Sequence, residues 1–243
     1  MIQNKRFALV FRLGALLFAL AGVMKQIGIF EGTVSFNPFM FYTIQSNLLA
    51  IALFALLAIR TAKGLREGSH GSVGWYSRFG MVCVVDLLVT MIVFWALLAP
   101  TVEAAYLLTF ENIAIHTVTP LLCLIDYILF SEPKRLKYRD VYYVCLFPLG
   151  YVALTSIAGL SGYVYGYEGI MSSPLSSYME MVPVRFPYFF LDFDRLGAMA
   201  LAYIGGILVF FLILSHSIYW IDRRIRKQPT AEASEPVPEY IAK

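Results

Sequence analysis

Hydrophobic residues form six long runs along the chain, separated by short segments in which polar residues dominate. The runs extend over residues 7–29, 39–59, 79–99, 112–130, 141–159 and 196–221. An α-helix needs about 20 apolar residues to cross the roughly 30 Å hydrocarbon core of a bilayer. The pattern therefore predicts an all-α, polytopic membrane bundle with six transmembrane helices.

Lysine and arginine residues mark one side of this bundle. They precede the first run, fill every second connection and follow the sixth run, whereas the alternate connections hold only Arg185 and Arg195. Basic connections stay in the cytoplasm, so both termini are expected there. Arg12 interrupts the first run, so we expect it to stay as a membrane span and not to be cleaved as a signal peptide. Residues 1–227 are predicted to form one domain, followed by a disordered cytoplasmic tail over residues 228–243.

Composition narrows the class of protein further. The chain is 59% hydrophobic and 14% charged, against roughly 25% charged in soluble proteins, which excludes a water-soluble domain. The net charge of +3 lies at the ends of the runs and forms no basic face for nucleic acid. The three cysteines lie inside apolar stretches at spacings that suit neither a disulfide framework nor a metal site. We expect no metal and no cofactor.

The second run carries polar residues near its start. Asn37 is a favourable helix cap and Pro38 a favourable first helical residue, which predicts a helix that begins there. Thr43 then lies about 9 Å along the axis. At 100° per residue, Ser46 and Asn47 share one helix face with Thr43.

The fourth run carries a histidine at a matching depth. If this helix begins at Thr109, His116 lies seven residues in, with Asn112 one turn earlier on the same face. Pro120 cannot donate to the carbonyl of His116, so we expect a kink and a free acceptor beside the histidine. Thr43 and His116 are predicted to face one another across a cavity in the outer half of the bundle.

These residue types suit nucleophilic catalysis. A threonine hydroxyl becomes a nucleophile when a neutral histidine removes its proton, which requires the two groups within about 3.2 Å or one water apart. Because N–H groups inside a helix are already bonded, we expect the side chains of Asn47 and Asn112 to stabilise an oxyanion. The alternative is structural, since Thr, Ser and Asn side chains commonly join helices within membranes.

A second group of polar residues is predicted nearer the cytoplasmic ends of the spans. Arg12, Asp86, Asp126 and His216 all fall within roughly 6–10 Å of that side. A buried arginine needs a carboxylate partner, so we expect Arg12 to pair with Asp86 or Asp126. This inner polar layer is interpreted as either a structural ion-pair network or the proton or ion path of a small transporter or channel.

Two segments resemble a known family. Asn112-x-x-x-His116-Thr117-x-x-Pro120 with the later Asp126, and the aromatic-rich segment around Thr43, resemble the androgen-induced and androgen-dependent transmembrane hydrolases. Those are six-span threonine hydrolases of fatty acid esters of hydroxy fatty acids. The sequence FPYFFLD over residues 186–192 is similar to a bacterial branch of that superfamily. This resemblance implies a bacterial inner-membrane protein.

The resemblance also assigns residues. It implies Thr43 as the nucleophile and His116 as the catalytic histidine, while Lys25, Tyr188 and Asp192 match less distinctive positions. Gln45-Ser46-Asn47 and the connection over residues 159–195 depart from the family pattern. Both departures bear on the substrate more than on the chemistry.

Three classes of function follow from these patterns. The first is an intramembrane hydrolase of lipid-like fatty acyl esters, with Thr43 as nucleophile, His116 as base, and Ser46, Asn47, Asn112, Lys25, Tyr188 and Asp192 as positioning candidates. The second is a small transporter or channel that uses the inner polar layer. The third is a non-enzymatic assembly protein. The tyrosine-rich connection over residues 159–195 is either an interfacial aromatic belt or a lid over a lipid site.

Overall fold

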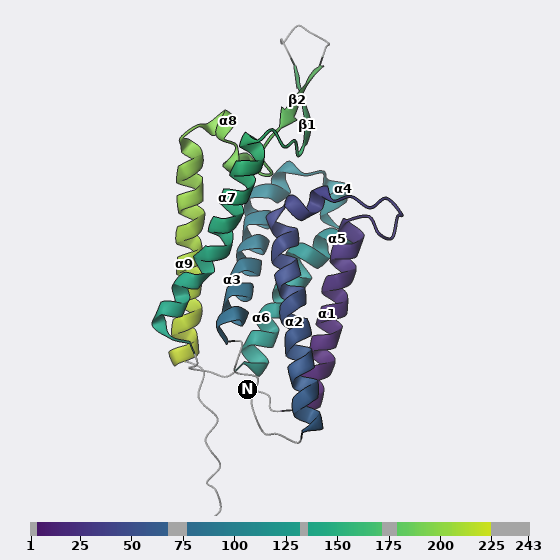
Figure 1. Ribbon diagram of the computed structural model, residues 1–243, viewed down its shortest axis with the longest axis vertical. Helices are drawn as coiled ribbons and strands as arrows, with labels where there is room; N and C mark the ends of the chain where they lie inside the picture. The colour runs from purple at the N-terminus through teal and green to yellow at the C-terminus, as the bar shows by residue number, and fades with distance from the viewer. Residues whose placement is uncertain (1–3, 68–76, 132–135, 172–178, 225–243) are drawn as a thin grey trace, which may run out of the picture.

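The computed structural model describes residues 4–67, 77–131, 136–171 and 179–224. Within these ranges, six helical segments are long and apolar enough to cross a membrane. They extend over Lys5–Gln26, Tyr42–Arg66, Arg78–Thr101, Phe110–Phe130, Tyr138–Leu160 and Met199–Arg224. The predicted all-α bundle with six spans is confirmed (Figure 1). The predicted tail, residues 228–243, lies outside the described ranges.

Several spans combine more than one kind of helix. The α-helices are α1 (Lys5–Gln26), α2 (Tyr42–Arg66), α3 (Ser77–Val93), α4 (Ala104–Leu107), α5 (Phe110–Ile113), α6 (Thr119–Phe130), α7 (Leu146–Leu160), α8 (Phe193–Leu196) and α9 (Met199–Arg224). The 3₁₀ segments are Asn37–Met40, Ala99–Thr101, Tyr138–Cys145 and Phe189–Leu191. Two π-helical turns, Phe94–Leu98 and Ala114–Val118, interrupt the third and fourth spans.

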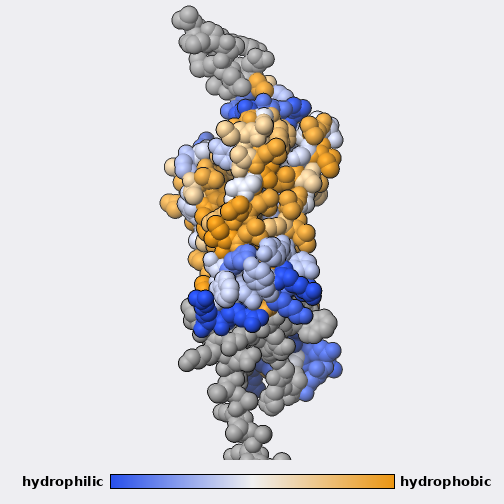
Figure 2. All heavy atoms as spheres, turned by 90° about the vertical axis from the view of Figure 1, so that its left-hand side faces the viewer, coloured by the Kyte–Doolittle hydropathy of each residue, from blue (hydrophilic) through white to orange (hydrophobic). Residues whose placement is uncertain are grey.

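The bundle has two distinct ends. A two-stranded antiparallel hairpin, β1 (Gly166–Met171) and β2 (Met179–Val184), projects from the end at which α2 begins, and we call this the hairpin end (Figure 1). At the other end, which we call the terminal end, α1 begins and α9 finishes. A band of apolar side chains lies between polar ends on the face in Figure 2. The protein is an integral membrane protein by this distribution.

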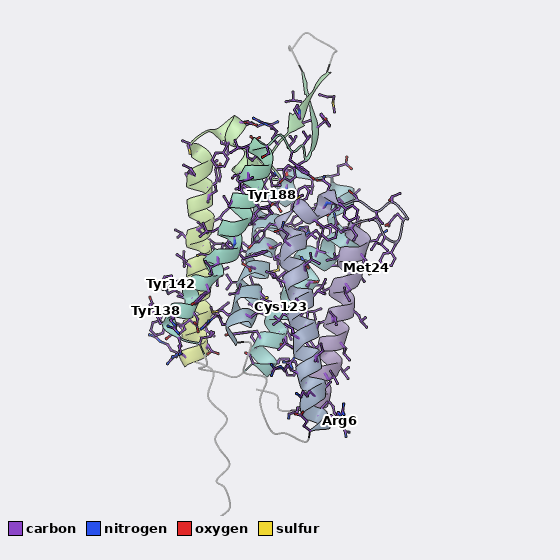
Figure 3. The ribbon with its side chains drawn as sticks, in the orientation of Figure 1. Arg6, Met24, Cys123, Tyr138, Tyr142 and Tyr188 are labelled. Atoms are coloured by element: carbon purple, nitrogen blue, oxygen red, sulfur yellow. The ribbon has the colours of Figure 1, made fainter. Side chains whose placement is uncertain are left out.

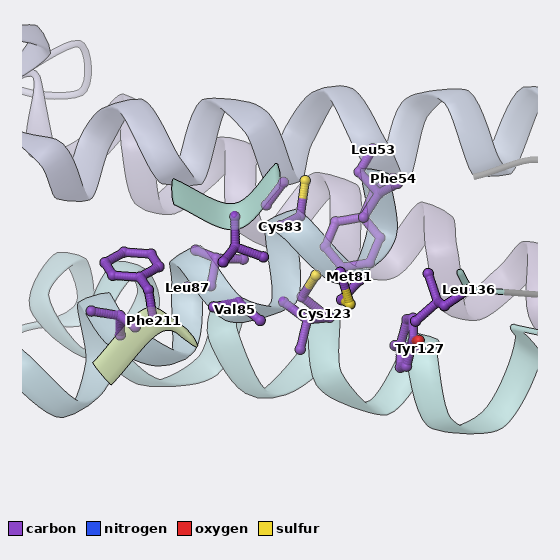
Figure 4. Packing of buried hydrophobic residues seen from close by; sticks show 14 of the residues in the cluster. Leu53, Phe54, Met81, Cys83, Val85, Leu87, Cys123, Tyr127, Leu136 and Phe211 are labelled. Atoms are coloured by element: carbon purple, nitrogen blue, oxygen red, sulfur yellow. The ribbon is translucent and has the colours of Figure 1, made fainter. Parts of the chain in front are cut away.

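The core is built around α3. Val84, Val85 and Leu87 are completely buried, and they pack with residues of α2, α6 and α9 in the cluster of Figure 4. On α1, small residues allow close approach of the neighbouring helix. A Cβ atom built at Gly22 would lie 2.8 Å from the Cβ of Ala114, so glycine is what lets α1 approach the π-helical turn of the fourth span.

Two predicted helix boundaries are wrong because glycines adopt a left-handed conformation. The first span was expected to reach residue 29 but ends at Gln26, since Gly28 has a φ of 82° and turns the chain. The last span was expected to begin at residue 196 but begins at Met199. Gly197, with a φ of 52°, separates it from the short helix α8. Non-glycine residues rarely adopt such positive φ angles.

The predicted start of the second span is also wrong, and this error changes the chemistry of the site. Residues Asn37–Met40 form a 3₁₀ turn, Phe41 is extended, and α2 begins at Tyr42. Asn37 does not cap α2. Its amide donates to the carbonyl of Tyr165 at 2.9 Å and accepts from the hydroxyl of Tyr163 at 3.1 Å. Thr43 therefore lies in the first turn of α2.

The expected distortion at Pro120 takes the form of a π-helical turn. The N–H of Thr119 bonds to the carbonyl of Ala114, five residues back. In this pattern the carbonyl of Ile115 would pair with residue 120, and proline has no N–H to offer. Pro120 thus leaves the carbonyl of Ile115 as an acceptor, one residue before the position expected from regular α-helical spacing. The amide of Asn47 donates to that carbonyl at 3.0 Å.

Candidate active site

Thr43 and His116 face one another inside the bundle, near the hairpin end. The Oγ1 atom of Thr43 lies 3.3 Å from Nε2 of His116, and the two residues are 8% and 5% exposed. The predicted proximity is confirmed. The two helix irregularities produce it together, because Thr43 lies in the first turn of α2 and His116 lies in the π-helical turn of the fourth span.

The hydrogen bonds of His116 identify its proton-free nitrogen. Nδ1 lies 3.2 Å from the backbone carbonyl oxygen of Asn112. A carbonyl only accepts, so Nδ1 carries the proton and donates it. In the neutral ring Nε2 is then bare and accepts the hydroxyl of Thr43. The group that orients the histidine is therefore a main-chain carbonyl.

Phe94, which the sequence interpretation missed, holds the imidazole from one side. The two rings stack with centroids 3.6 Å apart and an angle of 17° between their planes. Phe94 begins the π-helical turn of the third span, just as His116 lies in that of the fourth. The available signal was proline spacing, since Pro100 and Pro120 each follow such a turn by two residues. Single π-helical turns are frequent at functional sites.

Tyr188 lies next to Thr43, and both residues line the same space. Burial raises the pKa of Tyr188, while hydrogen bonds with the side chains of Thr43 and Tyr151 and with the backbone of Tyr42 and Thr43 act in the opposite direction. The backbone groups that take part belong to Tyr42 and Thr43, whose N–H groups are the donors available there. These groups lack helical partners because they belong to the first turn of α2. Figure 3 places Tyr188 near the hairpin end.

Asn47 does not supply the expected oxyanion donor, and Asn112 uses one of its two amide hydrogens within the protein. The amide of Asn47 donates to the carbonyls of Thr43, at 2.7 Å, and Ile115, at 3.0 Å, which uses both of its hydrogens. The amide of Asn112 donates to the carbonyl of Leu107 at 2.9 Å. Another donor beside Thr43 is the phenol of Tyr188, which hydrogen-bonds with the first turn of α2. The expectation is wrong for Asn47, because both of its amide hydrogens bond to main-chain carbonyls.

The other positioning candidates lie away from the catalytic atoms, apart from Ser46. The hydroxyl of Ser46 donates to the carbonyl of Thr43 at 3.0 Å, so it supports the first turn of α2. Lys25 forms an ion pair with Glu31. Asp192 caps α8 by accepting from the backbone N–H groups of residues 194 and 195. Neither Lys25 nor Asp192 reaches Thr43 or His116 by any contact among the described residues.

The expected inner polar layer divides into separate contacts. Arg12 pairs with Asp126, with Nε and Oδ1 2.8 Å apart, which confirms one of the two predicted pairings. Asp86 instead accepts from the hydroxyl of Tyr42 at 3.0 Å. Tyr42 begins α2 near the hairpin end, so placing Asp86 in a layer with Arg12 was wrong.

His216 is separate again. Its Nε2 atom lies 3.3 Å from the hydroxyl of Tyr138, which Figure 3 shows near the terminal end. Helix depth alone did not distinguish these residues, because it carries no information about which face each side chain takes. Arg12, Asp86 and His216 thus have three different partners.

Two cavities meet at Thr43. The first, which we call the slot, has a volume of about 70 Å³ and lies among α2, α3, α7 and α9. The second, which we call the vestibule, has a volume of about 630 Å³ and reaches from His116 to residues of the hairpin-end connections. Thr43, Leu98 and Tyr188 line both cavities. The two cavities therefore share part of their walls at Thr43.

The described residues contain no group of three or more His, Cys, Asp or Glu side chains that could hold a metal ion. Comparison with known proteins adds no assignment: no family model, curated protein or solved structure matches the chain.

Proposed function

We propose that this protein is an intramembrane hydrolase of fatty acyl esters, with Thr43 as the nucleophile and His116 as the general base. One observation carries the proposal: the threonine hydroxyl is directed at the bare Nε2 of a buried, oriented histidine where an apolar and a polar cavity meet. A purely structural pair of a hydroxyl and an imidazole would need no neighbouring cavity, because each group already provides the hydrogen-bond partner of the other. Access from two cavities is what a substrate requires.

The chemistry follows from the hydrogen bonds. His116 Nε2 takes the proton of Thr43 as Oγ1 attacks the ester carbonyl, and the Asn112 carbonyl supports the imidazolium through Nδ1–H. The oxygen of the tetrahedral intermediate accepts a hydrogen bond from Tyr188, whose phenol is held by the first turn of α2. Collapse of the intermediate expels the alcohol, which receives the proton from Nε2 and leaves an acyl ester on Thr43.

The second half of the reaction repeats these roles with water. His116 removes a proton from a water molecule, and the resulting hydroxide attacks the acyl carbonyl. The acid leaves as Thr43 recovers its proton from Nε2. Both halves use the same base and the same oxyanion donor.

Purified protein in detergent, treated with a fluorophosphonate probe, tests the assignment. We expect Thr43→Ala and His116→Ala each to abolish labelling and ester cleavage, while Thr43→Ser retains part of both because it keeps the hydroxyl. The double variant should be no worse than either single one, since the two residues act as a unit. Thr117→Ala is the matched control, because Thr117 adjoins His116 but bonds to Trp95. Full activity of folded Thr43→Ala protein would contradict the proposal.

The transporter hypothesis has less support from the contacts. A relay needs neighbouring groups that exchange protons, whereas Arg12, Asp86 and His216 bond to Asp126, Tyr42 and Tyr138 respectively. The pair of Arg12 and Asp126 is better explained as structural. Arg12 also donates to the hydroxyl oxygen of Thr61 at 2.6 Å, so the buried guanidinium has hydrogen-bond partners in its observed position.

A further inference from the structure

We propose that the substrate is a single-chain fatty acyl ester of an uncharged, polar alcohol, such as a monoacylglycerol, with the acyl chain in the slot and the alcohol in the vestibule. The inference rests on the proposed hydrolase function and narrows its substrate class. The two cavities share Thr43, so the scissile ester lies at their junction. The chemistry of each cavity then decides which half of the ester enters it.

The slot suits a hydrocarbon chain. Val93, Val152, Ile204 and Leu208 are among its walls, and no charged side chain lines it among the described residues. Its polar wall atoms are already bonded within the protein. For example, the hydroxyl of Tyr151 donates to the carbonyl of Met40 at 3.1 Å. An alkyl chain placed there loses no hydrogen bonds and leaves no wall group newly unpaired.

The vestibule suits a polar alcohol. Its walls near His116 are aromatic and aliphatic, but the segments at the hairpin end contribute hydroxyl and amide groups. These belong to Gln26, Ser35, Asn37, Thr101 and Tyr106. Free hydroxyl groups on an alcohol can bond to such side chains and to water in the same space. A second long alkyl chain would have to cover these polar groups without replacing their hydrogen bonds.

The charges in the vestibule disfavour an anionic alcohol half. Among its described lining residues the charged side chains are Glu168 and Arg195. The guanidinium of Arg195 is 2.5 Å from Glu168 and 3.3 Å from Asp192, so two carboxylates share one cation. A ligand carboxylate or phosphate would have to compete with these two carboxylates for the one cation of the vestibule. This distinguishes a neutral alcohol from the hydroxy fatty acid that the sequence resemblance implies.

Purified protein assayed with three oleoyl esters tests the proposal: monooleoylglycerol, the oleoyl ester of 12-hydroxystearic acid, and lysophosphatidic acid. We expect kcat/KM for monooleoylglycerol to exceed both others by about tenfold or more. Equal or greater kcat/KM for either anionic ester would overturn the substrate class and leave the hydrolase assignment standing. If none is cleaved and the fluorophosphonate probe does not label Thr43, the hydrolase proposal itself fails and this inference with it.

Charge variants test the vestibule directly. Glu168→Gln removes one carboxylate from Arg195, so we expect kcat/KM for the hydroxystearate ester to rise severalfold while that for monooleoylglycerol changes little. Asp194→Asn is the matched control, since Asp194 pairs with Arg185 and does not line the vestibule. An unchanged ratio of the two substrates in Glu168→Gln contradicts the proposed charge selection.

A bulky residue in the slot tests the position of the acyl chain. We expect Leu208→Trp to lower kcat/KM for monooleoylglycerol about tenfold or more. The kcat/KM for monobutyroylglycerol, whose chain is short, should change little. Retained cleavage of the short ester shows that the variant is folded. Val209→Trp is the control on the same helix, because Val209 is 55% exposed and lies outside the slot. Equal losses for both esters in Leu208→Trp would overturn the placement.

Discussion

At the scale of single residues, the chemistry depends on which protons are already engaged. His116 has one engaged nitrogen because Nδ1–H donates to the carbonyl of Asn112, and this leaves Nε2 bare toward Thr43. Asn47 has no amide hydrogen left for a substrate, because both serve main-chain carbonyls. Tyr188 is different, since burial keeps its phenol protonated beside Thr43, and we propose that it donates this proton in a hydrogen bond to the oxyanion.

Tyr188→Phe should therefore reduce turnover by about 10²–10³, the loss typical of one oxyanion donor. Because burial raises the pKa of Tyr188 above the ordinary value of 10.0, the phenol stays protonated at neutral pH, and its loss should not alter the pH profile below pH 9. Steady-state kinetics on monooleoylglycerol measure both effects. Tyr165→Phe is the control, since the hydroxyl of Tyr165 has no hydrogen-bond partner among the described residues. Unchanged kcat in Tyr188→Phe would remove Tyr188 from the mechanism.

At the scale of elements, the site depends on irregular helices held in register. The π-helical turn Ala114–Val118 carries His116, and Asn47 of α2 bonds to the carbonyl that Pro120 leaves unpaired. On its other side α1 presses against the same turn, with Gly22 directly opposite Ala114. The position of the histidine is thus set by its neighbours as well as by its own helix.

Gly22→Ala should push α1 away from this turn, because its Cβ would lie 2.8 Å from that of Ala114, a side chain that cannot move aside. We expect a loss of about 1–3 kcal/mol in the free energy of unfolding, as for overpacked cores. Activity should fall as well. Gly14→Ala on the same helix meets nothing within 4 Å and should be neutral or slightly stabilising. Thermal unfolding in detergent compares the two, and similar melting temperatures would contradict this packing argument.

At the scale of the whole molecule, charge is distributed unevenly between the two ends. At the hairpin end Lys25, Arg185 and Arg195 each pair with a carboxylate. The terminal end carries Lys5, Arg6, Arg60, Lys63, Arg66, Arg78, Lys137, Arg139, Arg223 and Arg224 among the described residues. Because basic connections are retained in the cytoplasm, we expect the hairpin end to face outward.

Single cysteines test this orientation in protein whose own three cysteines have been replaced by alanine. Val34→Cys near the hairpin end is predicted to react with a membrane-impermeant maleimide on intact cells. Lys63→Cys near the terminal end should react only after permeabilisation. Both positions are suitable because Val34 is 52% exposed and the side chain of Lys63 is 68% exposed. The reverse labelling pattern would show that the protein is inserted the other way.

The sequence by itself determined the class of protein and the candidate pair. Membrane spans are readable from hydropathy because every backbone polar group in lipid must be bonded within its own segment, which leaves helices as the solution for runs of this length. Thr43 and His116 were identifiable because polar residues are rare in such runs. Their proximity also followed from sequence, since two helices with matched depths bring such residues to the same level.

Only the tertiary structure decided which other groups complete the site around Thr43 and His116. Helix α2 begins at Tyr42 and not directly after Asn37, as the sequence predicted. The reason is that Asn37 bonds to the connection that leads into the hairpin, more than 120 residues away in sequence. That shift exposes the N–H groups that hold Tyr188. Likewise, Asn47 has a structural role and Asp86 does not belong to the inner polar layer, because each side chain bonds to a partner on another helix. Helix periodicity gives depth and face, but such partners depend on how six helices rotate and pack together.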